Sequence, residues 1–376
     1  MKRLFNIFFC ILRSKKIFSL EKKKFVIFDC TNSEILSKIL PNDETYVISA
    51  RVNLIKKLLI NFTTLQFIIK NFFSRSIQLN YYISLILQLQ PKLVITTIDN
   101  SVNFSILTKY FENKIKFIAI QNGTRGEFYE NNNNLNKNFY FTNYFGFSNF
   151  DLELMKKNNI IVKNFFSVGS LTNSYFQKFS LNDSLNLNKS YEICYVGKRT
   201  FENGKVVSTK VAADSLILLK LLSRYVKKYN KSIILQLKSK KFNLEENNYI
   251  EKLFSGTNFK INLMDNLTKF NSYKNISSSK LVVGAPSSLL REASVYPNTK
   301  ILCLDTEKKK DKIPFVGLNI FNETSYEKFE ERLNLLFNLN YEDYTKKLEK
   351  KHTYLMHNTN TIENFLEFLK KNTDPL

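Results

Sequence analysis

Short apolar runs followed by polar or turn residues recur through the first half of the chain, and each predicts a buried strand. Stretches of helical character separate these runs. The predicted strands are Phe25–Phe28, Tyr46–Ile48, Leu93–Thr97 and Ile115–Ile120, with weaker candidates at Phe139–Phe141 and Phe165–Val168. The predicted helices are about Ser33–Leu40, Leu54–Phe73, Ile77–Leu89 and Val102–Phe111. Strands that alternate with helices in this way are typical of a parallel sheet covered by helices on both faces.

The second half of the chain repeats the same alternation. Its predicted strands are Glu192–Val196, Ile233–Leu237, Phe259–Met264, Lys280–Val283 and Lys300–Leu304. Its predicted helices are about Ala212–Tyr229, Glu245–Leu253, Leu267–Ser277 and Ser287–Val295. Open sheets of this kind bind ligands at the carboxyl ends of their strands. The sequence therefore predicts an α/β protein of two Rossmann-like domains that face each other across a cleft.

A polar stretch rich in Asn and Ser separates the two halves, and we interpret it as a linker over residues 171–190. The predicted N-terminal domain then covers residues 1–170 and the C-terminal domain residues 191–324. A charged helical tail is predicted over residues 325–376. At 376 residues, the chain is long enough to give each domain a core of its own.

The composition is that of a globular protein, with 44% hydrophobic and 24% charged residues. The four cysteines are scattered and form no Cys-x-x-Cys pair, and the two histidines, His352 and His357, lie near the end of the chain. The sequence therefore shows no metal site, and it excludes a histidine base from both domain bodies. Isolated thiols fit a reducing cytoplasm.

The formal net charge is +23, from 56 Lys and Arg against 33 Asp and Glu. One interpretation is compositional bias, because the chain is rich in Lys, Asn, Ile and Phe but has 9 Gly and no Trp. A second interpretation is contact with an anionic membrane surface. Nucleic acid is not expected as a partner, because the sequence contains no RNA-binding or zinc-finger motif.

The segment Met1–Leu20 combines an apolar run, Leu4–Leu12, with basic flanks. The run is too short to span a bilayer, which needs about 20 residues. It also lacks the small-residue cleavage site of a signal peptide. The segment predicts either a basic amphipathic element on an anionic membrane or a helix packed on the first domain. The expected location is the cytoplasm, with peripheral attachment to the inner face of the plasma membrane in the first case.

The segment Lys280–Ser294 reads as a strand, a tight loop at Gly284 and the start of a helix. Ser287 and Ser288 stand where the helix is expected to begin, and Glu292 follows one turn later. A helix start presents unpaired N–H groups and the positive end of the helix dipole, which suit a phosphate. The carboxylate one turn on is placed to reach the hydroxyls of a ribose. The segment predicts a nucleotide site, and the alternative is an ordinary helix capped by Ser287.

Two further loops of the second domain carry cations at predicted strand ends. Gly197 and Arg199 follow the first strand of this domain, and Lys238 follows the second. Arg199 is predicted to hold a phosphate through paired hydrogen bonds, and Lys238 to act as a point charge. The alternative for each cation is a solvated surface charge.

Polar loops also follow two predicted strands of the first domain, and both are expected to open into the cleft. Their carboxylates are Asp99 and Glu127, and one of the two is predicted to be a general base for an acceptor hydroxyl. Turn formation at Asn122-Gly123 and helix capping by Asp99 are the alternatives. The predicted acceptor side of the cleft comprises Asn100, Gln121, Asn122, Gly123 and Arg125.

Four of these segments together resemble bacterial surface carbohydrate biosynthesis proteins: Ile98–Ser101, Ile118–Arg125, Val168–Ser170 and Ser287–Ala293. The resemblance covers about residues 93–304 and implies a glycosyltransferase of the GT-B type, with two Rossmann-like domains. The wider group includes capsule and teichoic-acid polymerases of the glycerophosphotransferase kind, which typically carry a His before the loop Gly. Here that position is Asn122, and an amide cannot accept a proton.

The resemblance implies an enzyme that transfers a nucleotide-activated sugar into a bacterial surface polysaccharide, either LPS O-antigen or capsule. The donor is expected on the second domain, and a glycan or lipid-linked acceptor on the first. The nucleotide sugar is a substrate, and neither a cofactor nor a metal is expected, because cations of the chain meet the leaving-group charge. The alternatives are a polyol-phosphate transferase or sugar-nucleotide epimerase of the same fold, and a non-catalytic membrane-associated assembly subunit.

Overall fold

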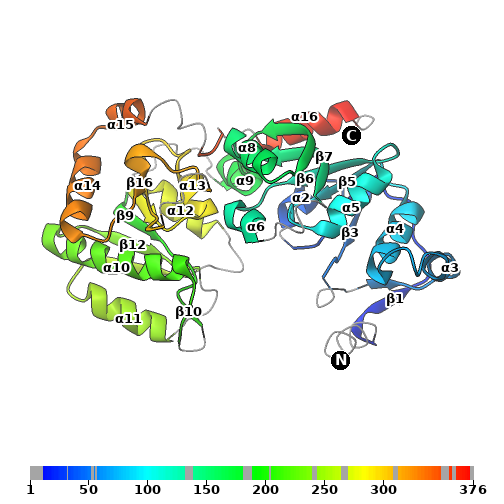
Figure 1. The fold of residues 1–376 in the computed structure, drawn as a ribbon, viewed down its shortest axis with the longest axis horizontal. Helices are drawn as coiled ribbons and strands as arrows, with labels where there is room; N and C mark the ends of the chain where they lie inside the picture. Colours follow the sequence, from blue (N-terminus) through cyan, green and yellow to red (C-terminus); the bar gives the residue numbers. More distant parts are fainter. Residues whose placement is uncertain are drawn as a thin grey trace.

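The structure is a computed structural model, and it describes residues 12–31, 33–51, 55, 57–131, 139–180, 189–202, 205–238, 244–263, 270–307, 312–348, 355–357 and 361–372. Two α/β domains lie beside each other, each built around a parallel six-stranded sheet (Figure 1). The fold class predicted from the sequence is confirmed.

The sheet of the N-terminal domain has the strand order β3-β2-β5-β6-β7-β8, and all of its strands are parallel. The strands are β2 (Phe25–Phe28), β3 (Thr45–Ile48), β5 (Leu93–Thr96), β6 (Lys116–Ile120), β7 (Tyr140–Gly146) and β8 (Ile161–Ser167). Every residue of β2 and β5 is buried, which explains why these strands read as unbroken apolar runs. All six strands predicted for this half are present, and β7 and β8 extend beyond their predicted bounds.

Two apolar cores cover the two faces of this sheet. Val26 and Phe28 of β2 point into one core, and Phe25 and Ile27 point into the other, as the two-residue period of a strand requires. Helices α4 (Ile77–Leu89), α5 (Val102–Phe111), α6 (Gly126–Asn131) and α8 (Asn149–Lys157) flank the first core. Helices α2 (Glu34–Ile39), α9 (Leu171–Ser180) and α16 (Thr361–Asn372) complete the second.

The sheet of the C-terminal domain has the order β13-β12-β9-β14-β15-β16 and is also parallel. Its strands are β9 (Tyr191–Val196), β12 (Ile233–Gln236), β13 (Phe259–Asn262), β14 (Ser279–Gly284), β15 (Lys300–Leu304) and β16 (Ile320–Phe321). Numbered within the domain, this is the 3-2-1-4-5-6 order of a dinucleotide-binding sheet. The five strands predicted for this half are confirmed, and β16 is an addition.

Helices cover both faces of this second sheet as well. Helices α10 (Lys210–Tyr229), α11 (Leu244–Phe254), α14 (Tyr326–Asn338) and α15 (Tyr341–Lys347) pack on one face. Helices α12 (Asn271–Ser277) and α13 (Ser288–Ala293) pack on the other. A short antiparallel hairpin, β10 (Phe201–Glu202) with β11 (Lys205–Val206), follows β9.

The structure corrects the predicted linker and tail. Residues 171–180 form α9, which packs on both domains, because Leu171 enters the N-terminal core and Phe176 enters the C-terminal core. Residues 181–188 of the predicted linker lie outside the described residues. The tail is not one unit: α14 and α15 pack on the C-terminal domain, whereas α16 crosses back and packs on α9 and the N-terminal sheet.

The predicted helix over residues 54–73 is also only partly correct. Residues Lys57–Leu59 form strand β4, which pairs in parallel with β1 (Lys15–Ile17), and the helix α3 spans Phe62–Lys70. The first eleven residues of Met1–Leu20, on which the prediction of a membrane segment depends, lie outside the described residues. No helix in the described part of the chain is long and apolar enough to cross a bilayer.

Candidate functional site

A cavity of about 420 Å³ lies between the two domains and is lined by residues of both. It opens at the carboxyl ends of the strands in both sheets: Thr97 and Gln121 follow β5 and β6, and Gly197 and Leu237 follow β9 and β12. In each sheet this edge includes the point where strand order reverses, between β2 and β5 and between β9 and β14. Ligands of open α/β sheets bind at such points, so the predicted cleft is present and has the expected position.

The segment Lys280–Ser294 folds as the sequence predicts, as strand β14, a tight loop and helix α13. Ser287 is the N-cap residue of α13, and its side-chain oxygen accepts a hydrogen bond from the Leu290 N–H at 3.1 Å. The capped-helix alternative is therefore correct in itself. Because α13 has only six residues, its dipole is small. Ser287 and Ser288 both line the cavity, so contact with a nucleotide stays a prediction.

Gly284 has a packing role instead of a place in the cavity lining. A β-carbon at this residue would lie 2.9 Å from the backbone oxygen of Val196 on the neighbouring strand β9. Glycine therefore allows β14 and β9 to approach closely. Gly197, at the end of β9, does line the cavity, and a β-carbon there would lie 3.2 Å from the Gln236 oxygen.

Glu292 lines the cavity and is almost completely buried. Tyr273 donates a hydrogen bond to its carboxyl group at 3.0 Å, and the Ser170 hydroxyl donates a second from the other domain. Burial raises the pKa of Glu292 to about 7, and these two hydrogen bonds only partly offset that effect. Near neutral pH this group is able to take up or release a proton.

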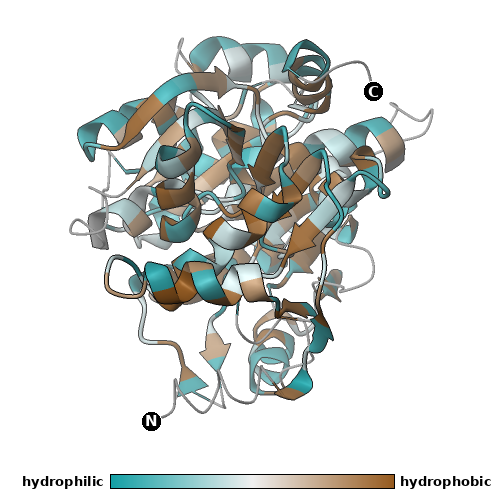
Figure 2. Cartoon of the chain, turned by 90° about the vertical axis from the view of Figure 1, so that its right-hand side faces the viewer, coloured by the Kyte–Doolittle hydropathy of each residue, from teal (hydrophilic) through white to brown (hydrophobic). Residues whose placement is uncertain are grey.

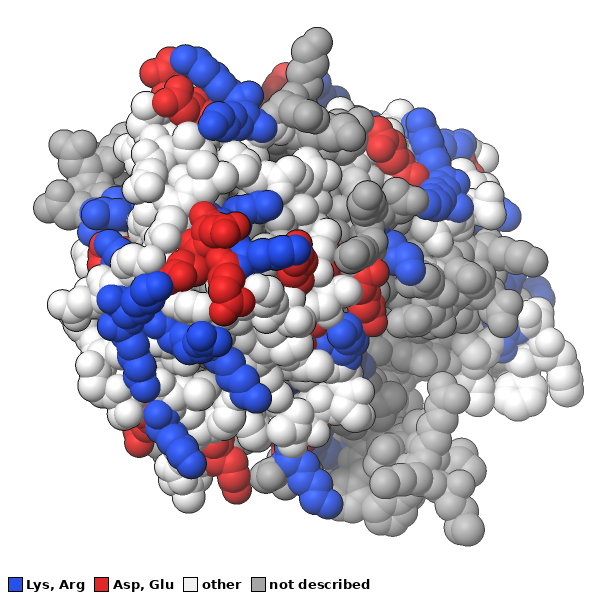
Figure 3. Space-filling view, turned by 60° about the vertical axis from the view of Figure 1, so that its left-hand side comes forward, with Lys and Arg blue, Asp and Glu red and all other residues white. Residues whose placement is uncertain are grey.

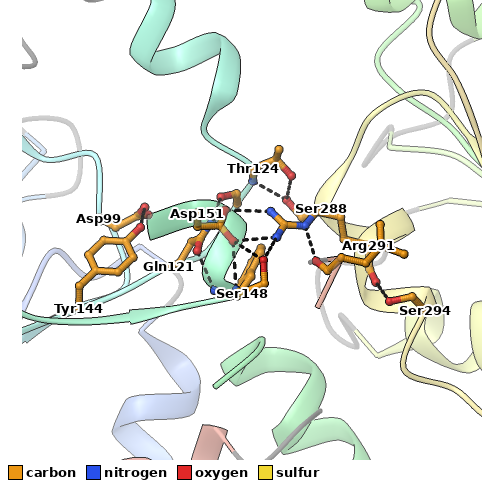
Figure 4. Close-up of polar contacts among 12 residues, drawn as sticks. Asp99, Gln121, Thr124, Tyr144, Ser148, Asp151, Ser288, Arg291 and Ser294 are labelled. Carbon is orange, nitrogen blue, oxygen red and sulfur yellow. Dashed lines mark hydrogen bonds and ion pairs between the residues drawn. The ribbon is translucent and has the colours of Figure 1, made fainter. Parts of the chain in front are cut away.

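The same helix carries an ion pair that joins the domains. Arg291 is fully buried, and its guanidinium donates to both carboxylate oxygens of Asp151 on α8, at 3.0 and 2.7 Å (Figure 4). It also donates to the Ser148 hydroxyl at 3.2 Å and to the Leu355 carbonyl at 2.7 Å. Breaking a buried pair of this kind costs about 3–5 kcal/mol. The pair therefore holds α13 in a fixed position against the N-terminal domain.

Ser288 supplies another link between the domains. Its hydroxyl oxygen accepts a hydrogen bond from the Thr124 N–H at 3.0 Å (Figure 4). Ser288, Arg291 and Glu292 thus each contact the N-terminal domain. The segment that the sequence assigns to a nucleotide site is in this structure also an interdomain contact.

The cations predicted for the second domain have different places. Lys238 lines the cavity, as predicted. Arg199 does not: its side chain is 65% exposed and forms a surface ion pair with Glu202 at 3.2 Å. The predicted role of Arg199 at a phosphate is therefore wrong, and its neighbour Lys198 lines the cavity instead. Lys38 of the N-terminal domain adds a third cation to the lining.

Asp99 is the main correction on the acceptor side. Its side chain is fully buried, does not line the cavity and already accepts hydrogen bonds from two side chains. Arg125 Nε donates to it at 2.8 Å with a second guanidinium hydrogen bond alongside, and the Tyr144 hydroxyl donates at 2.7 Å. Burial alone lowers the pKa of Arg125, but the Asp99 carboxylate raises it well above its ordinary value. Asp99 and Arg125 are a buried structural pair, and the prediction of Asp99 as the general base is wrong.

The loop after β6 is partly in the cavity. Gln121 and Asn122 line it, whereas Asn100 and Gly123 do not. The Gln121 amide donates to Asp151 at 2.7 Å and to the Gly123 carbonyl at 2.9 Å, and its oxygen accepts from the Phe147 N–H at 2.8 Å. Gln121 therefore supports the residues that hold Arg291. The backbone of Glu127 lies in α6, and its side chain is outside the described residues, so its predicted role is untested.

Sequence reasoning missed two residues of the acceptor side, Glu34 and Lys38. Both lie on α2 and line the cavity. The available signal was their position in the first helix after β2, since that helix begins at the carboxyl edge of the sheet. Among the described residues that line the cavity, the carboxylates are those of Glu34 and Glu292.

No protein-family model matches the chain, and no curated protein matches its sequence. Solved structures do match its fold. UDP-GlcNAc 2-epimerase from Neisseria meningitidis, bound to UDP-GlcNAc, has a TM-score of 0.57 at 14% identity, over 94% of this chain and 100% of that one. The S. aureus MnaA–UDP structure has a TM-score of 0.55 at 10% identity, over 93% and 96%. Acinetobacter baumannii MurG has a TM-score of 0.50 at 12% identity, over 93% and 99%.

At these identities the similarities concern the fold alone. Each match covers nearly the whole of both chains, so it includes both domains and their connection. This chain therefore has the GT-B fold, with two Rossmann-like domains and a cavity between them.

Proposed function

We propose that the chain is a glycosyltransferase that uses a nucleotide-activated sugar to build a bacterial cell-surface polysaccharide, LPS O-antigen or capsule. The observation that carries the proposal is the lining of the interdomain cavity, to which the C-terminal domain contributes Lys198 and Lys238 and the N-terminal domain contributes Glu34. Two cations at the carboxyl edge of one sheet suit an anionic donor, and a carboxylate at the edge of the other suits a hydroxyl acceptor. Support also comes from the GT-B fold and from UDP-sugar enzymes among the similar structures.

In this proposal the C-terminal domain binds the donor. The ammonium groups of Lys198 and Lys238 meet the negative charge that develops on the leaving phosphate, which lowers the energy of the transition state. Ser287 and Ser288 contact the phosphates, and Gly197 lets the ligand approach the backbone at the end of β9. Glu292 accepts hydrogen bonds from the ribose hydroxyls, as the sequence predicts.

Glu34 replaces Asp99 as the proposed general base. It projects from the acceptor domain into the cavity lining and is exposed there, whereas Asp99 is sealed in its pair with Arg125. A carboxylate at this position takes the proton from the attacking hydroxyl of a glycan or lipid-linked acceptor. Asn122 lies beside the same space and orients that hydroxyl.

The decisive experiment is nucleotide binding by calorimetry with UDP, GDP and CMP, on the wild type and matched variants. We expect one nucleotide to bind, and Lys198→Ala and Lys238→Ala each to weaken it about tenfold or more, since hydrogen bonds to charged groups contribute about 1.5–3 kcal/mol. Arg199→Ala is the control, because it removes an adjacent cation that does not line the cavity. If no nucleotide binds, or all three variants bind equally, the proposal fails.

A sugar-nucleotide epimerase is the second candidate, and the similarity to UDP-GlcNAc 2-epimerases from three organisms favours it. An epimerase must move a proton at the sugar ring without an acceptor. Among the described residues of the cavity lining, the carboxylates for that step are those of Glu34 and Glu292. Incubation with UDP-GlcNAc alone in deuterium oxide separates the two candidates. An epimerase incorporates deuterium into the sugar, and a glycosyltransferase leaves the sugar unlabelled.

The proposed transfer needs no metal or cofactor, because the lysines meet the leaving-group charge. Activity that survives EDTA is the expected result.

We also propose that the protein acts in the cytoplasm, at the inner face of the plasma membrane. A polyol-phosphate transferase would use CDP-activated polyols in the same assay. A non-catalytic assembly subunit would keep full function in cells when Glu34 and Lys198 are both replaced, and loss of surface polysaccharide in that variant excludes it.

A further inference from the structure

One part of the N-terminal domain has an unusual charge distribution. Residues 45–98 contain no Asp or Glu, but they contain six Lys and Arg. Helices α3 and α4, which lie in this stretch, pack together at the end of the molecule away from the C-terminal domain (Figure 1). The C-terminal domain differs, since basic and acidic side chains are interspersed on its surface (Figure 3), as in the ion pair Lys228–Glu330.

Helix α3 and the turn after it expose large apolar side chains. We call these five residues the α3 face: Phe62 (78% exposed), Leu65 (50%), Ile69 (74%), Phe72 (51%) and Phe73 (99%). Their spacing of three or four residues along the helix places Phe62, Leu65 and Ile69 on one side of it. The end of the molecule that carries α3 is turned toward the viewer in Figure 2. Clustered apolar exposure of this kind marks an interaction surface.

The opposite side of α3, which packs on α4, combines an apolar contact of Phe67 with polar contacts. Thr64 is buried there, and its hydroxyl oxygen accepts a hydrogen bond from Gln88 at 2.9 Å, with the Ser84 hydroxyl at 3.2 Å. Asn61, the N-cap residue, donates to Gln88 at 2.7 Å. A surface helix normally turns its apolar side inward and its polar side to water. Helix α3 departs from this arrangement, because Phe62, Leu65 and Ile69 are exposed on the other side, which is therefore suited to an apolar environment.

We propose that the α3 face inserts into the surface of an anionic lipid bilayer. Lipid fits better than a protein partner because the stretch of chain that carries the face, residues 45–98, contains basic residues and no acidic ones. Lys70 at the end of α3 and Lys57 on β4, which precedes this helix, are exposed. The aromatic and aliphatic side chains enter the boundary between headgroups and acyl chains, and the lysines bind the lipid phosphates. None of the five residues of this surface lines the cavity, and the proposal does not depend on the proposed function.

The test is co-sedimentation of the full chain with vesicles of phosphatidylglycerol and phosphatidylethanolamine, and with vesicles of phosphatidylcholine. We expect binding to the anionic vesicles and a loss of binding at high salt. Ile69→Gln combined with Phe73→Gln is expected to weaken binding about a hundredfold, at about tenfold for each apolar side chain withheld from the bilayer. Lys70→Gln is expected to weaken it about fivefold.

The matched control is Leu244→Gln on α11, because Leu244 is 61% exposed but lies on the other domain. It should leave binding unchanged, and unaltered melting temperatures should show that all variants fold. The proposal is overturned if the wild type ignores anionic vesicles, or if the Ile69/Phe73 variant binds them as the wild type does. It is also overturned if sedimentation velocity shows that the α3 face holds two copies together and vesicles are not bound.

Discussion

Replacing Glu292 with Gln is expected to stabilise the protein at alkaline pH. Burial raises the pKa of this carboxyl from an ordinary 4.5 to about 7, so the folded state binds a proton that the unfolded state has released. Stability therefore falls as the pH rises from about 4.5 through about 7, and the full penalty is present above that range. The difference between the two pKa values corresponds to about 3 kcal/mol at pH 8.5.

The Gln side chain keeps the shape of the carboxyl and removes its charge. Its amide oxygen accepts the same hydrogen bonds from Ser170 and Tyr273. Thermal unfolding at pH 4.0, 5.5 and 8.5 measures the effect. We expect similar melting temperatures for both proteins at about pH 4.0, and a higher one for the variant by about 2 °C at pH 5.5 and about 4 °C at pH 8.5 for a chain of this length. Glu342→Gln is the control, because its side chain is 77% exposed and pays no burial penalty.

Two results would refute this reasoning. If the difference between variant and wild type does not change with pH, the carboxyl group has the same charge in the folded and unfolded states. If the variant is less stable than the wild type at pH 8.5, the ionised carboxylate of Glu292 stabilises the folded state instead of destabilising it. Calorimetry then measures the affinity of the Glu292→Gln variant for the nucleotide. A variant that is more stable but binds the nucleotide more weakly would show that Glu292 serves binding at the expense of stability.

Three further predictions concern the ion pair between the domains, a buried pair within the N-terminal domain and a close strand contact within the C-terminal domain. Asp151→Asn should lower the free energy of unfolding by about 3–5 kcal/mol, because it leaves the Arg291 guanidinium buried without its partner charge, and urea unfolding measures the loss. Asp99→Asn should lower the free energy of unfolding by about 3 kcal/mol in the same assay. At temperatures well below unfolding, its rate of sugar transfer should stay within about threefold of the wild type. A loss of about a hundredfold or more would show that Asp99 is the base after all. Gly284→Ala should cost about 1–3 kcal/mol, because the new methyl group meets the backbone of Val196, and an unchanged melting temperature would show that the two strands separate freely.

The strands of both sheets could be predicted from the sequence for a physical reason. Parallel strands covered by helices on both faces must be apolar at every position, so β2, β5 and β14 stand out from the polar segments around them. The helix predicted over residues 54–73 was partly wrong because a three-residue strand at its start gives no separate signal. Its pairing with β1 depends on a segment about forty residues earlier.

The sequence predicted which residues of the candidate site follow the ends of strands, but not how their side chains are oriented. The sequence placed Gly197, Lys238 and Ser287 at the right edge of the sheet, and the structure brings them to one cavity. It could not show which side chains point into that cavity, so Arg199 was chosen over its neighbour Lys198. It also could not show that Asp99 is sealed by Arg125, because that depends on how the loop after β6 folds back.

The path of the chain determines how the two domains are able to move. It passes from the N-terminal domain to the C-terminal domain after α9, and it returns before α16, which packs on the N-terminal sheet. The C-terminal domain is therefore inserted between two stretches of the chain that build the N-terminal domain. A motion that moves α13 away from the N-terminal domain has to break the buried pair of Arg291 with Asp151. Opening of the cavity by such a motion is thereby coupled to the loss of that pair.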